Sequence, residues 1–289
     1  MKYFIVSDVH GYYDKMIEAL NKAGYDKNNP EHIFVSLGDL LDRGRQPYEC
    51  ISFVNSLPKE RKILIRGNHE TLLNDAAWRE CFEWNDFPNG TSQTVRDLYN
   101  HENAAISGEG FNYADETQNG YKNQEETLRW LRHWGPYKQY HYSTVPYAVV
   151  GDNIFVHGWV PNETKCKADL EKFHTTQWEH AAWRNGMQAY YWCGPVYKTE
   201  EDFQEEWDIN DNIDTSTICT VFCGHYHTSW WRKHITHEQA SSIPRDEEWD
   251  EMTAEERANW FRPVIRPGLV ALDACTAYSG IINCYVLET

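Results

Sequence analysis

The stretch Ile33-Phe34-Val35-Ser36-Leu37-Gly38-Asp39-Leu40-Leu41-Asp42-Arg43-Gly44 begins with an apolar run and continues into a segment rich in glycine and carboxylates. The apolar run predicts a buried strand that ends where the polar residues begin. Four more motifs stand in the same position after an apolar run. They are Asp8-Val9-His10, Arg66-Gly67-Asn68-His69-Glu70, Val156-His157-Gly158 and Gly224-His225-Tyr226-His227. The pattern therefore places carboxylate, amide and imidazole groups at the ends of five strands.

Strand and helix patterns alternate in the first part of the chain. Lys2 to Val6 and Ile63 to Ile65 are further apolar runs, whereas Asp14 to Lys22 and Pro47 to Leu57 are predicted helices. Strands that alternate with helices form parallel sheets, in which catalytic groups lie at the carboxyl ends of the strands. We therefore expect an α/β fold with the five motifs at one rim of its sheet.

The whole chain, residues 1–289, is predicted to form one domain, with insertions at about residues 71–142 and 161–216. The first insertion is expected to be mostly helical, with a helix at Gln124 to His133. The remaining expected elements are listed in chain order. They are a hairpin of Ala148 to Val150 with Ile154 to Val156, a strand Ile218 to Cys223, a solvated helix Arg245 to Arg257, and two antiparallel strands, Val264 to Asp273 and Ile281 to Leu287.

Composition limits the class of partner and the compartment. The formal net charge of −17 argues against broad nucleic-acid or anionic-membrane binding, which depends on lysine and arginine. Eight cysteines stand singly without a Cys-x-x-Cys pair, and no apolar stretch has the length of a signal peptide core or a membrane span. We expect a soluble, cytoplasmic protein. The 13 Trp and 18 Tyr serve either core packing or a stacking platform for an aromatic ligand.

The polar groups at the strand ends form a candidate ligand set for metal ions. Asp8 and His10 alone are better explained as a helix cap and a loop histidine. Asp39 is stronger evidence, because a carboxylate that follows a glycine at a strand end can bridge two ions. Asn68 offers an amide oxygen, and His157 and His225 offer imidazoles. Such mixed oxygen and nitrogen donors suit two divalent transition ions, which points to hydrolysis of a phosphate ester.

The chain resembles the calcineurin-like metallophosphoesterases. Within them it is similar to the serine/threonine phosphoprotein phosphatase group, which includes bacterial and phage phosphatases and the symmetrical bis(5'-nucleosyl)-tetraphosphatases. Gly38 to Gly44 and Leu64 to Glu70 match the two most specific signatures of that group in full. The likeness is close over residues 1–75 and then reduces to motifs around His157, His225 and Leu272 to Tyr278. It implies a β-sandwich flanked by helices (αββα), with a dinuclear metal site at the strand ends.

The resemblance also implies roles for the ligands. Asp8 and His10 would bind one ion, Asp39 would bridge, and the second ion would be bound by Asn68, His157 and His225. Two ions about 3.5–4 Å apart would hold a shared water and supply hydroxide as the nucleophile. Manganese is the expected metal, and iron, zinc or cobalt would also fit these donors.

Other residues would act on the substrate. By the resemblance, His69 protonates the departing alkoxide, Asp42 orients His69, and Arg43 grips phosphate oxygens with its planar fork of donors. Arg66 either contacts phosphate or pairs with a structural carboxylate. Arg184, in Trp183-Arg184-Asn185-Gly186, loosely resembles a second phosphate-binding arginine.

One departure from the group leaves the substrate open. Phosphoprotein phosphatases usually carry only the first histidine of the last motif, whereas this chain has both His225 and His227. His227 is either a further metal ligand or a neighbour of the ligands. The leading hypothesis is a phosphomonoesterase of protein-phosphatase type that acts on a phosphoprotein or a nucleotide. The alternatives are a nucleotide-directed hydrolase, acting on a dinucleoside polyphosphate, a cyclic nucleotide or an RNA end, and a non-catalytic binding scaffold.

Overall fold

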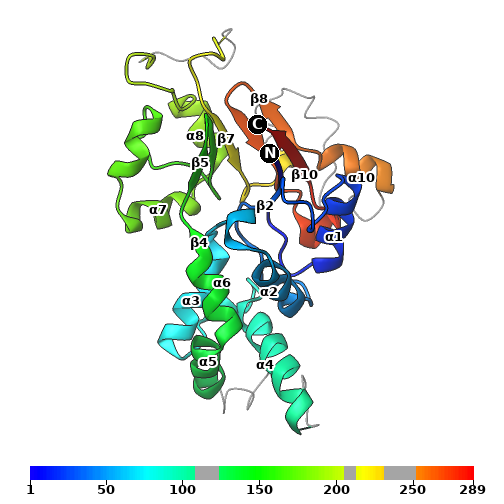
Figure 1. The fold of residues 1–289 in the computed structure, drawn as a ribbon. Coiled ribbons are helices and arrows are strands. Elements are labelled where there is room, and N and C mark those ends of the chain that lie inside the picture. The colour runs from blue at the N-terminus through cyan, green and yellow to red at the C-terminus, as the bar shows by residue number, and fades with distance from the viewer. Residues whose placement is uncertain (108–123, 205–212, 231–251) are drawn as a thin grey trace.

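Two five-stranded sheets face one another in the structure, which is a computed structural model that describes residues 1–107, 124–204, 213–230 and 252–289 (Figure 1). Strands β1 to β4 of the first sheet run parallel, and β10 pairs antiparallel with β1. In spatial order the first sheet contains β10 (Cys284–Glu288), β1 (Lys2–Val6), β2 (His32–Ser36), β3 (Lys62–Ile65) and β4 (Thr144–Val145).

The second sheet has a parallel centre and antiparallel edges. Strands β6, β7 and β9 run parallel, while β5 and β8 form hairpins with β6 and β9. In spatial order it contains β5 (Ala148–Val150), β6 (Asn153–Phe155), β7 (Thr220–Cys223), β9 (Leu269–Ala271) and β8 (Val264–Arg266).

Alternate side chains of these strands form the core between the sheets. Ile5 and Val35 from the first sheet meet Phe155, Phe222 and Val270 from the second, and all five are buried. Neighbouring residues along a strand point to opposite faces. Each sheet therefore has a second apolar face, and that face must be covered by helices.

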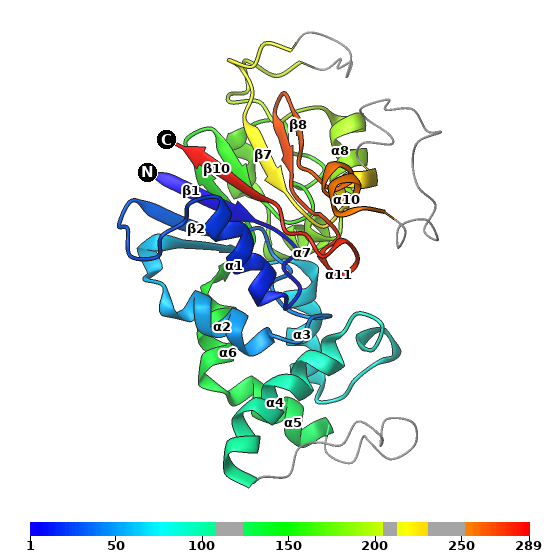
Figure 2. The same cartoon turned by 90° about the vertical axis from the view of Figure 1, so that its right-hand side faces the viewer.

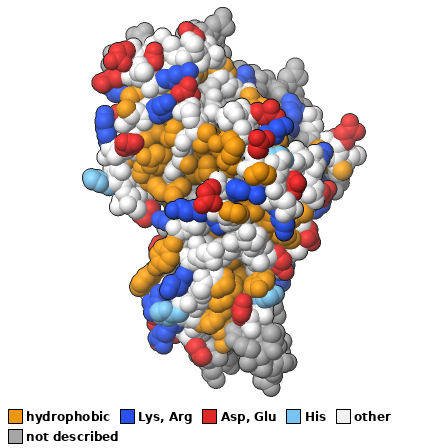
Figure 3. All heavy atoms as spheres, in the orientation of Figure 1, with side chains coloured by type: hydrophobic (Ala, Val, Ile, Leu, Met, Phe, Trp, Pro, Cys, Tyr) orange, Lys and Arg blue, Asp and Glu red, His pale blue; other side chains and the backbone are white. Residues whose placement is uncertain are grey.

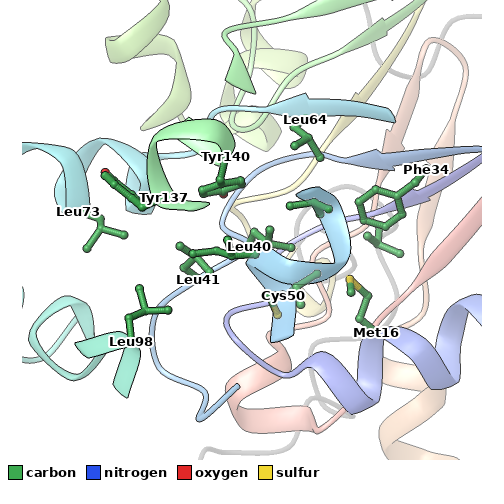
Figure 4. Close-up of a cluster of buried hydrophobic side chains, with 14 of the residues drawn as sticks. Met16, Phe34, Leu40, Leu41, Cys50, Leu64, Leu73, Leu98, Tyr137 and Tyr140 are labelled. Atoms are coloured by element: carbon green, nitrogen blue, oxygen red, sulfur yellow. The ribbon is translucent and has the colours of Figure 1, made fainter. Parts of the chain in front are cut away.

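Helices α1 (Tyr13–Lys22) and α2 (Pro47–Ser56) cover the outer face of the first sheet (Figure 2). Met16 of α1 and Cys50 of α2 belong to the same buried cluster as Phe34 (Figure 4). Leu40 and Leu41, from the loop after β2, lie at the centre of this cluster. The loop that carries Asp39 is thus anchored by apolar side chains on its own sequence.

Four further helices form a lobe at one side of the sandwich (Figures 1 and 2). They are α3 (Asn68–Arg79), α4 (Thr91–Ser107), α5 (Gln124–His133) and α6 (Gly135–Ser143). Leu98, Leu128 and Tyr137 extend the buried cluster of the first sheet into this lobe without a break. The lobe therefore shares one core with the sheet that carries the first three motifs.

Helices α7 and α8 pack against the second sheet. Trp178 of α7 and Tyr190 of α8 pack with Ile154 and Val221 of that sheet. The bounds of these elements and of the short 3-10 turns are α7 (Thr175–Ala182), α8 (Gly186–Cys193), α10 (Ala254–Trp260), α11 (Thr276–Ser279), η1 (Lys59–Arg61), η2 (Trp84–Asp86) and η4 (Lys167–Lys172).

The predicted fold class, a helix-flanked β-sandwich, is confirmed, and so are the helix Gln124–His133 and the hairpin of β5 with β6. The prediction for the end of the chain was wrong. Residues 264–273 do not form one strand, because the chain turns at Gly268 (φ +74°) and makes the hairpin of β8 with β9. The last strand, β10, joins the other sheet instead, beside β1.

The remaining expectations concern a solvated helix and the absence of a membrane span. The solvated helix predicted at residues 245–257 lies partly outside the described residues, and α10 begins at Ala254. Acidic and basic side chains are interspersed on the face drawn in Figure 3. Among the described residues, every helix is too short or too polar to cross a lipid bilayer.

Candidate dinuclear metal site

Loops after strands of both sheets meet at one rim of the sandwich. Asp8 follows β1, Asp39 follows β2, and Asn68 opens α3 after β3. His157 follows β6 and His225 follows β7. Backbone hydrogen bonds join the loops, from the amide of His10 to the carbonyl of Asp39 (2.9 Å) and from the amide of Gly224 to the carbonyl of His157 (2.7 Å). The parallel strands thus bring all five motifs together, as their positions after apolar runs predict.

Asp39 lies at the centre of the site. Its Oδ2 is 3.3 Å from Nε2 of His157, 3.8 Å from Nε2 of His69 and 3.9 Å from Nε2 of His10. Within the described ranges, two groups of side chains could each hold an ion: His10, Asp39 and His69, and Asp39, His157 and His225. Asp39 belongs to both groups. One buried carboxylate shared by two sets of imidazoles is the arrangement that a bridging ligand requires.

Backbone carbonyls fix the orientation of two imidazoles. Nδ1 of His157 donates to the carbonyl of Leu37 (2.7 Å), and Nδ1 of His10 donates to that of Leu41 (3.1 Å). A carbonyl only accepts, so the proton stays on Nδ1 and Nε2 faces Asp39. Nε2 of His157 also lies 2.9 Å from Oδ1 of Asn68. Such converging nitrogen and oxygen donors fit divalent transition ions.

The charges of the site show what a cation would replace. Burial lowers the pKa of His157, but Asp39 and its hydrogen bond outweigh burial and raise that pKa to about 10. Burial likewise raises the pKa of Asp39, yet His157 and His69 hold it well below its usual range. In the absence of an ion, a proton on His157 balances the Asp39 carboxylate. A divalent ion bound there would have to displace this proton.

Asp8 lies next to a carboxylate that the sequence analysis did not include, Asp273. Asp8 accepts hydrogen bonds from Oγ of Ser7 and from the amide of His225 (3.0 Å). Burial, followed by the charge of Asp273, raises the pKa of Asp8 to about 8. Asp273 itself is buried two residues after β9, at a sixth strand end. Its position after the apolar run Leu269 to Leu272 is the signal that could have identified it.

His227 and Asp8 lie outside both groups of converging ligands that the described part of the chain contains. Nε2 of His227 is 3.9 Å from Oδ2 of Asp273, and its side chain is 34% exposed. Burial lowers its pKa, and the nearby Asp8 raises it in part. His227 therefore lies on the side of the site that carries Asp8 and Asp273.

His69 is held by a carboxylate on one side and faces Asp39 on the other. Its Nδ1 is 2.8 Å from Oδ2 of Asp42, which also accepts from Oγ1 of Thr91 (2.8 Å). Nη2 of Arg43 lies 3.3 Å from Nε2 of His69. Burial lowers the pKa of His69, but Asp39 and Asp42 together raise it above its ordinary value. The pair favours a protonated imidazole beside the site.

Glu70 ties two of the loops together, a role that the motif alone did not reveal. Its carboxylate accepts from the amides of Asp39 (2.9 Å), Leu40 (2.9 Å) and Gly67 (2.7 Å). The hydroxyl of Tyr140, on α6, adds a fourth hydrogen bond of 2.6 Å. Glu70 is thus the link between the loop after β2, the loop after β3 and the helical lobe.

Strained backbone is concentrated in these loops. Six site residues other than glycine have a positive φ: Asp8 (51°), His10 (52°), Asp39 (53°), Asp42 (71°), Arg43 (68°) and His225 (63°). This left-handed conformation costs energy in residues that carry a Cβ, and it clusters at functional sites. The loops also leave no room beside Gly67, where a Cβ would lie 2.1 Å from Oδ1 of Asp39. Tight loops of this kind aim several short side chains at one point.

Comparison with known protein families agrees with this geometry. The family model described as calcineurin-like phosphoesterase matches residues 1–229. The chain belongs to this family. The solved structure of a point mutant of a cold-active protein tyrosine phosphatase aligns with a TM-score of 0.50 at 16% identity, covering 100% of this chain and 75% of that chain. At that identity the likeness supports the fold alone.

Curated relatives match a short part of this phosphoesterase. The asymmetrical bis(5'-nucleosyl)-tetraphosphatase PrpE of Bacillus subtilis is 40% identical over 76 residues, which are 24% of this chain and 31% of that protein. Serine/threonine-protein phosphatase 1 of Salmonella typhimurium is 32% identical over 73 residues, 25% of this chain and 32% of that protein. The chain thus spans about a third of the length of these relatives.

The side-chain hydrogen bonds of Arg66 and Arg184 go to Thr144 and Val160, which are not predicted metal ligands. Nε of Arg66 donates to Oγ1 of Thr144 (3.0 Å), and its Nη2 donates to the carbonyl of the same residue (3.3 Å). Nη1 of Arg184 donates to the carbonyl of Val160 (2.6 Å). In this calcineurin-like phosphoesterase, only Arg43 of the three predicted arginines is seen among the described contacts to bring a side-chain nitrogen close to a residue of the two ligand groups, 3.3 Å from Nε2 of His69.

Proposed function

We propose that this protein is a metal-dependent phosphomonoesterase with the machinery of a serine/threonine protein phosphatase. The observation that carries the proposal is the pairing of His69 with Asp42 beside the shared carboxylate Asp39. A monoester with an alkyl leaving group needs a proton at that group, and a carboxylate-held imidazole can supply one. Arg43 adds a planar donor fork for phosphate oxygens next to the same imidazole.

The ligand set supports two divalent ions. Asp8 and His10 would hold one ion, Asp39 would be shared, and Asn68, His157 and His225 would hold the other. When bound, such ions polarise phosphate oxygens and acidify water. We favour manganese, and iron, zinc or cobalt would suit the same donors. His227 would add a ligand on the Asp8 side.

The residues of the chain account for the proton balance. A water molecule adds its oxygen to phosphorus while the bond from phosphorus to the ester oxygen breaks. Since Nδ1 of His69 is held by Asp42, the proton on Nε2 passes to the departing oxygen and yields the free alcohol. The attacking water loses one proton as its oxygen bonds to phosphorus, and transfer of that proton through solvent restores His69. The products are an alcohol and hydrogen phosphate.

The substrate would be a phosphoprotein or a nucleotide. A nucleotide-directed hydrolase, which could act on a dinucleoside polyphosphate, is favoured by one specific observation, an exposed tryptophan beside His225. The asymmetrical bis(5'-nucleosyl)-tetraphosphatase of Bacillus subtilis, one of the relatives, agrees with it. The scaffold alternative predicts missing ligands, but all six predicted ligands are present in the chain. We place the enzyme in the cytoplasm, because its cysteines stand singly along the sequence.

The first test is hydrolysis of p-nitrophenyl phosphate and of bis-p-nitrophenyl phosphate while manganese is titrated into chelator-stripped protein. Preference for the monoester supports the proposal, preference for the diester favours a phosphodiesterase with His227 as a ligand, and inactivity on both supports the scaffold.

The second test examines His69. His69→Asn should lower turnover of phosphoserine by at least about a hundredfold, since general acid catalysis contributes about 10²–10⁴. The aryl ester has a better leaving group, so its loss should be much smaller. Equal losses on both esters would exclude His69 as the general acid.

A further inference from the structure

Trp183 lies beside His225, one of the predicted metal ligands. It is the C-cap residue of α7, and its ring centroid is 6.2 Å from that of His225 with the planes at 80°. The end of α7 is fixed there by Gly158, next to the ligand His157. A Cβ on Gly158 would lie 2.6 Å from the carbonyl oxygen of Ala182. The main chain therefore fixes the end of α7, and with it Trp183, close to the segment that carries His157.

Trp183 is 46% exposed, although an exposed tryptophan loses the benefit of burial. Trp159, two residues after His157, is by contrast only 2% exposed and packs on Tyr190. Core packing accounts for Trp159 and leaves the exposure of Trp183 unexplained.

Aromatic rings continue on the other side of His225. The ring of Tyr226 is 5.7 Å from that of His225, and the ring of Trp230 is 6.4 Å from that of Tyr226. Trp230 is 50% exposed. A row of four rings thus passes through a predicted metal ligand, with partly exposed indoles at both ends.

We propose that Trp183 is a stacking surface for the base of a nucleoside phosphate, which makes it a residue that determines substrate specificity. This inference rests on the proposed function, because it needs the phosphate of the substrate to lie at the metal site. Bases stack on exposed aromatic side chains with little dependence on sequence, because every base has a flat face.

The geometry favours a nucleoside over a simple aryl ester. The departing oxygen must lie at His69, which belongs to the ligand group of His10 and Asp39. Trp183 instead contacts His225, which belongs to the other ligand group, that of Asp39 and His157. An aryl group attached directly to the ester oxygen would remain on the His69 side. In a nucleotide, the ribose separates the base from the phosphate and lets the base reach the opposite side. Trp183 therefore suits a ring that is set back from the phosphorus.

The test compares Trp183→Ala with Trp192→Ala in manganese-loaded protein. Trp192 is a matched control, since it is 76% exposed on the neighbouring helix α8 and touches Tyr191 rather than a predicted ligand. Steady-state kinetics are measured with adenosine 5'-monophosphate and phosphoserine. We expect Trp183→Ala to raise KM for the nucleotide about tenfold, within the loss typical of one stacked base, and to change KM for phosphoserine less than twofold. Trp183→Phe should recover most of the nucleotide affinity, and Trp192→Ala should match the wild type.

Binding provides a readout that does not depend on turnover. Adenosine 5'-monophosphate and diadenosine tetraphosphate should quench tryptophan emission saturably in the wild type, and Trp183→Ala should weaken that binding about tenfold. Equal KM changes for nucleotide and phosphoserine, or unchanged nucleotide binding in Trp183→Ala, would overturn the stacking role. So would absence of nucleotide binding in the wild type. Hydrolysis of p-nitrophenyl phosphate separates this failure from failure of the proposed function, because that ester has no base to stack.

Discussion

Replacing Glu70 with glutamine should destabilise the fold and the metal site together. Glu70 is 3% exposed, and all four of its partners donate to it: the amides of Asp39, Leu40 and Gly67, and the hydroxyl of Tyr140. A carboxylate accepts at both oxygens, whereas an amide replaces one oxygen with an NH₂ donor. The NH₂ group would then face other hydrogen-bond donors in a buried site, where water is not available to accept from them.

The cost follows from the better of the two amide orientations. If NH₂ takes the place of Oε1, the Tyr140 hydroxyl can turn and accept, but the amide of Leu40 is left without an acceptor. A buried unsatisfied donor costs about 1–3 kcal/mol, and the bonds of Asp39 and Gly67 weaken because the acceptor is no longer charged. We therefore expect Glu70→Gln to lower the free energy of unfolding by about 3 kcal/mol. Tyr140→Phe, which removes a single donor, should cost about 1 kcal/mol.

Urea denaturation of the metal-free single and double variants measures these costs, and the double-mutant cycle gives the coupling between Glu70 and Tyr140. Manganese affinity should fall in Glu70→Gln more than in Tyr140→Phe, because Glu70 holds the backbone of Asp39. Burial raises the pKa of Glu70. If Glu70 were protonated in the fold, glutamine would mimic it. If Glu70→Gln lowered the free energy of unfolding no more than Tyr140→Phe does, the view that Glu70 is an ionised acceptor in the fold would thus be refuted.

Two further substitutions test the centre of the site. Asp39→Asn should remove bound metal and activity together, because the shared carboxylate is the only negative group common to both ligand sets in the described part of the chain; metal content measured after dialysis checks this, and retained metal would contradict the bridging role. Gly224→Ala should also abolish metal binding, because its Cβ would lie 1.8 Å from Oγ of Ser7 and 2.2 Å from Oδ2 of Asp8. Gly135→Ala is its control, since a Cβ there meets no atom within 4 Å outside its immediate chain neighbours. Similar metal content in both glycine variants would argue against the crowding at Asp8.

The sequence predicts the strand ends well, because period and apolar runs are local properties of the chain. The helix α5 and the loops that carry Asp8, Asp39, Asn68, His157 and His225 follow from such local signals. Local signals do not predict which sheet the last strand joins. β10 and β9 have similar apolar patterns, and only tertiary packing decides that β10 pairs with β1 in the other sheet.

The residues that the sequence analysis missed act at long range. Asp273 stands 265 positions after Asp8 in the numbering, and Tyr140 stands 70 positions after Glu70. No spacing rule along the chain links such pairs, because the fold alone brings them into contact. Trp183 is similar: the sequence places it beside Arg184, but only the structure shows that it is exposed next to His225.

Manganese should stabilise the protein more as the pH rises from about 5 to about 8. The pKa of Asp8 is raised to about 8 by burial and by Asp273, and that of Asp273 is raised to about 6, chiefly by burial. Both lie above the ordinary value of 3.8, so ionisation of these groups disfavours the metal-free fold, whose stability falls as pH rises through about 6 and about 8. His157, with its pKa raised to about 10, acts in the same direction.

A bound cation favours the ionised carboxylates and a neutral imidazole, so it should offset this loss. Manganese at about a hundred times its dissociation constant adds about 2.7 kcal/mol, or roughly 5 °C in Tm for a chain of this size. At about pH 5, protons compete for the same ligands and the gain should shrink. Calorimetry of chelator-stripped and manganese-loaded protein across this range measures it, with Asp39→Asn as the variant that should show no gain. A gain that is constant with pH, or largest in acid, would mean that the cation does not replace protons on Asp8, Asp273 and His157.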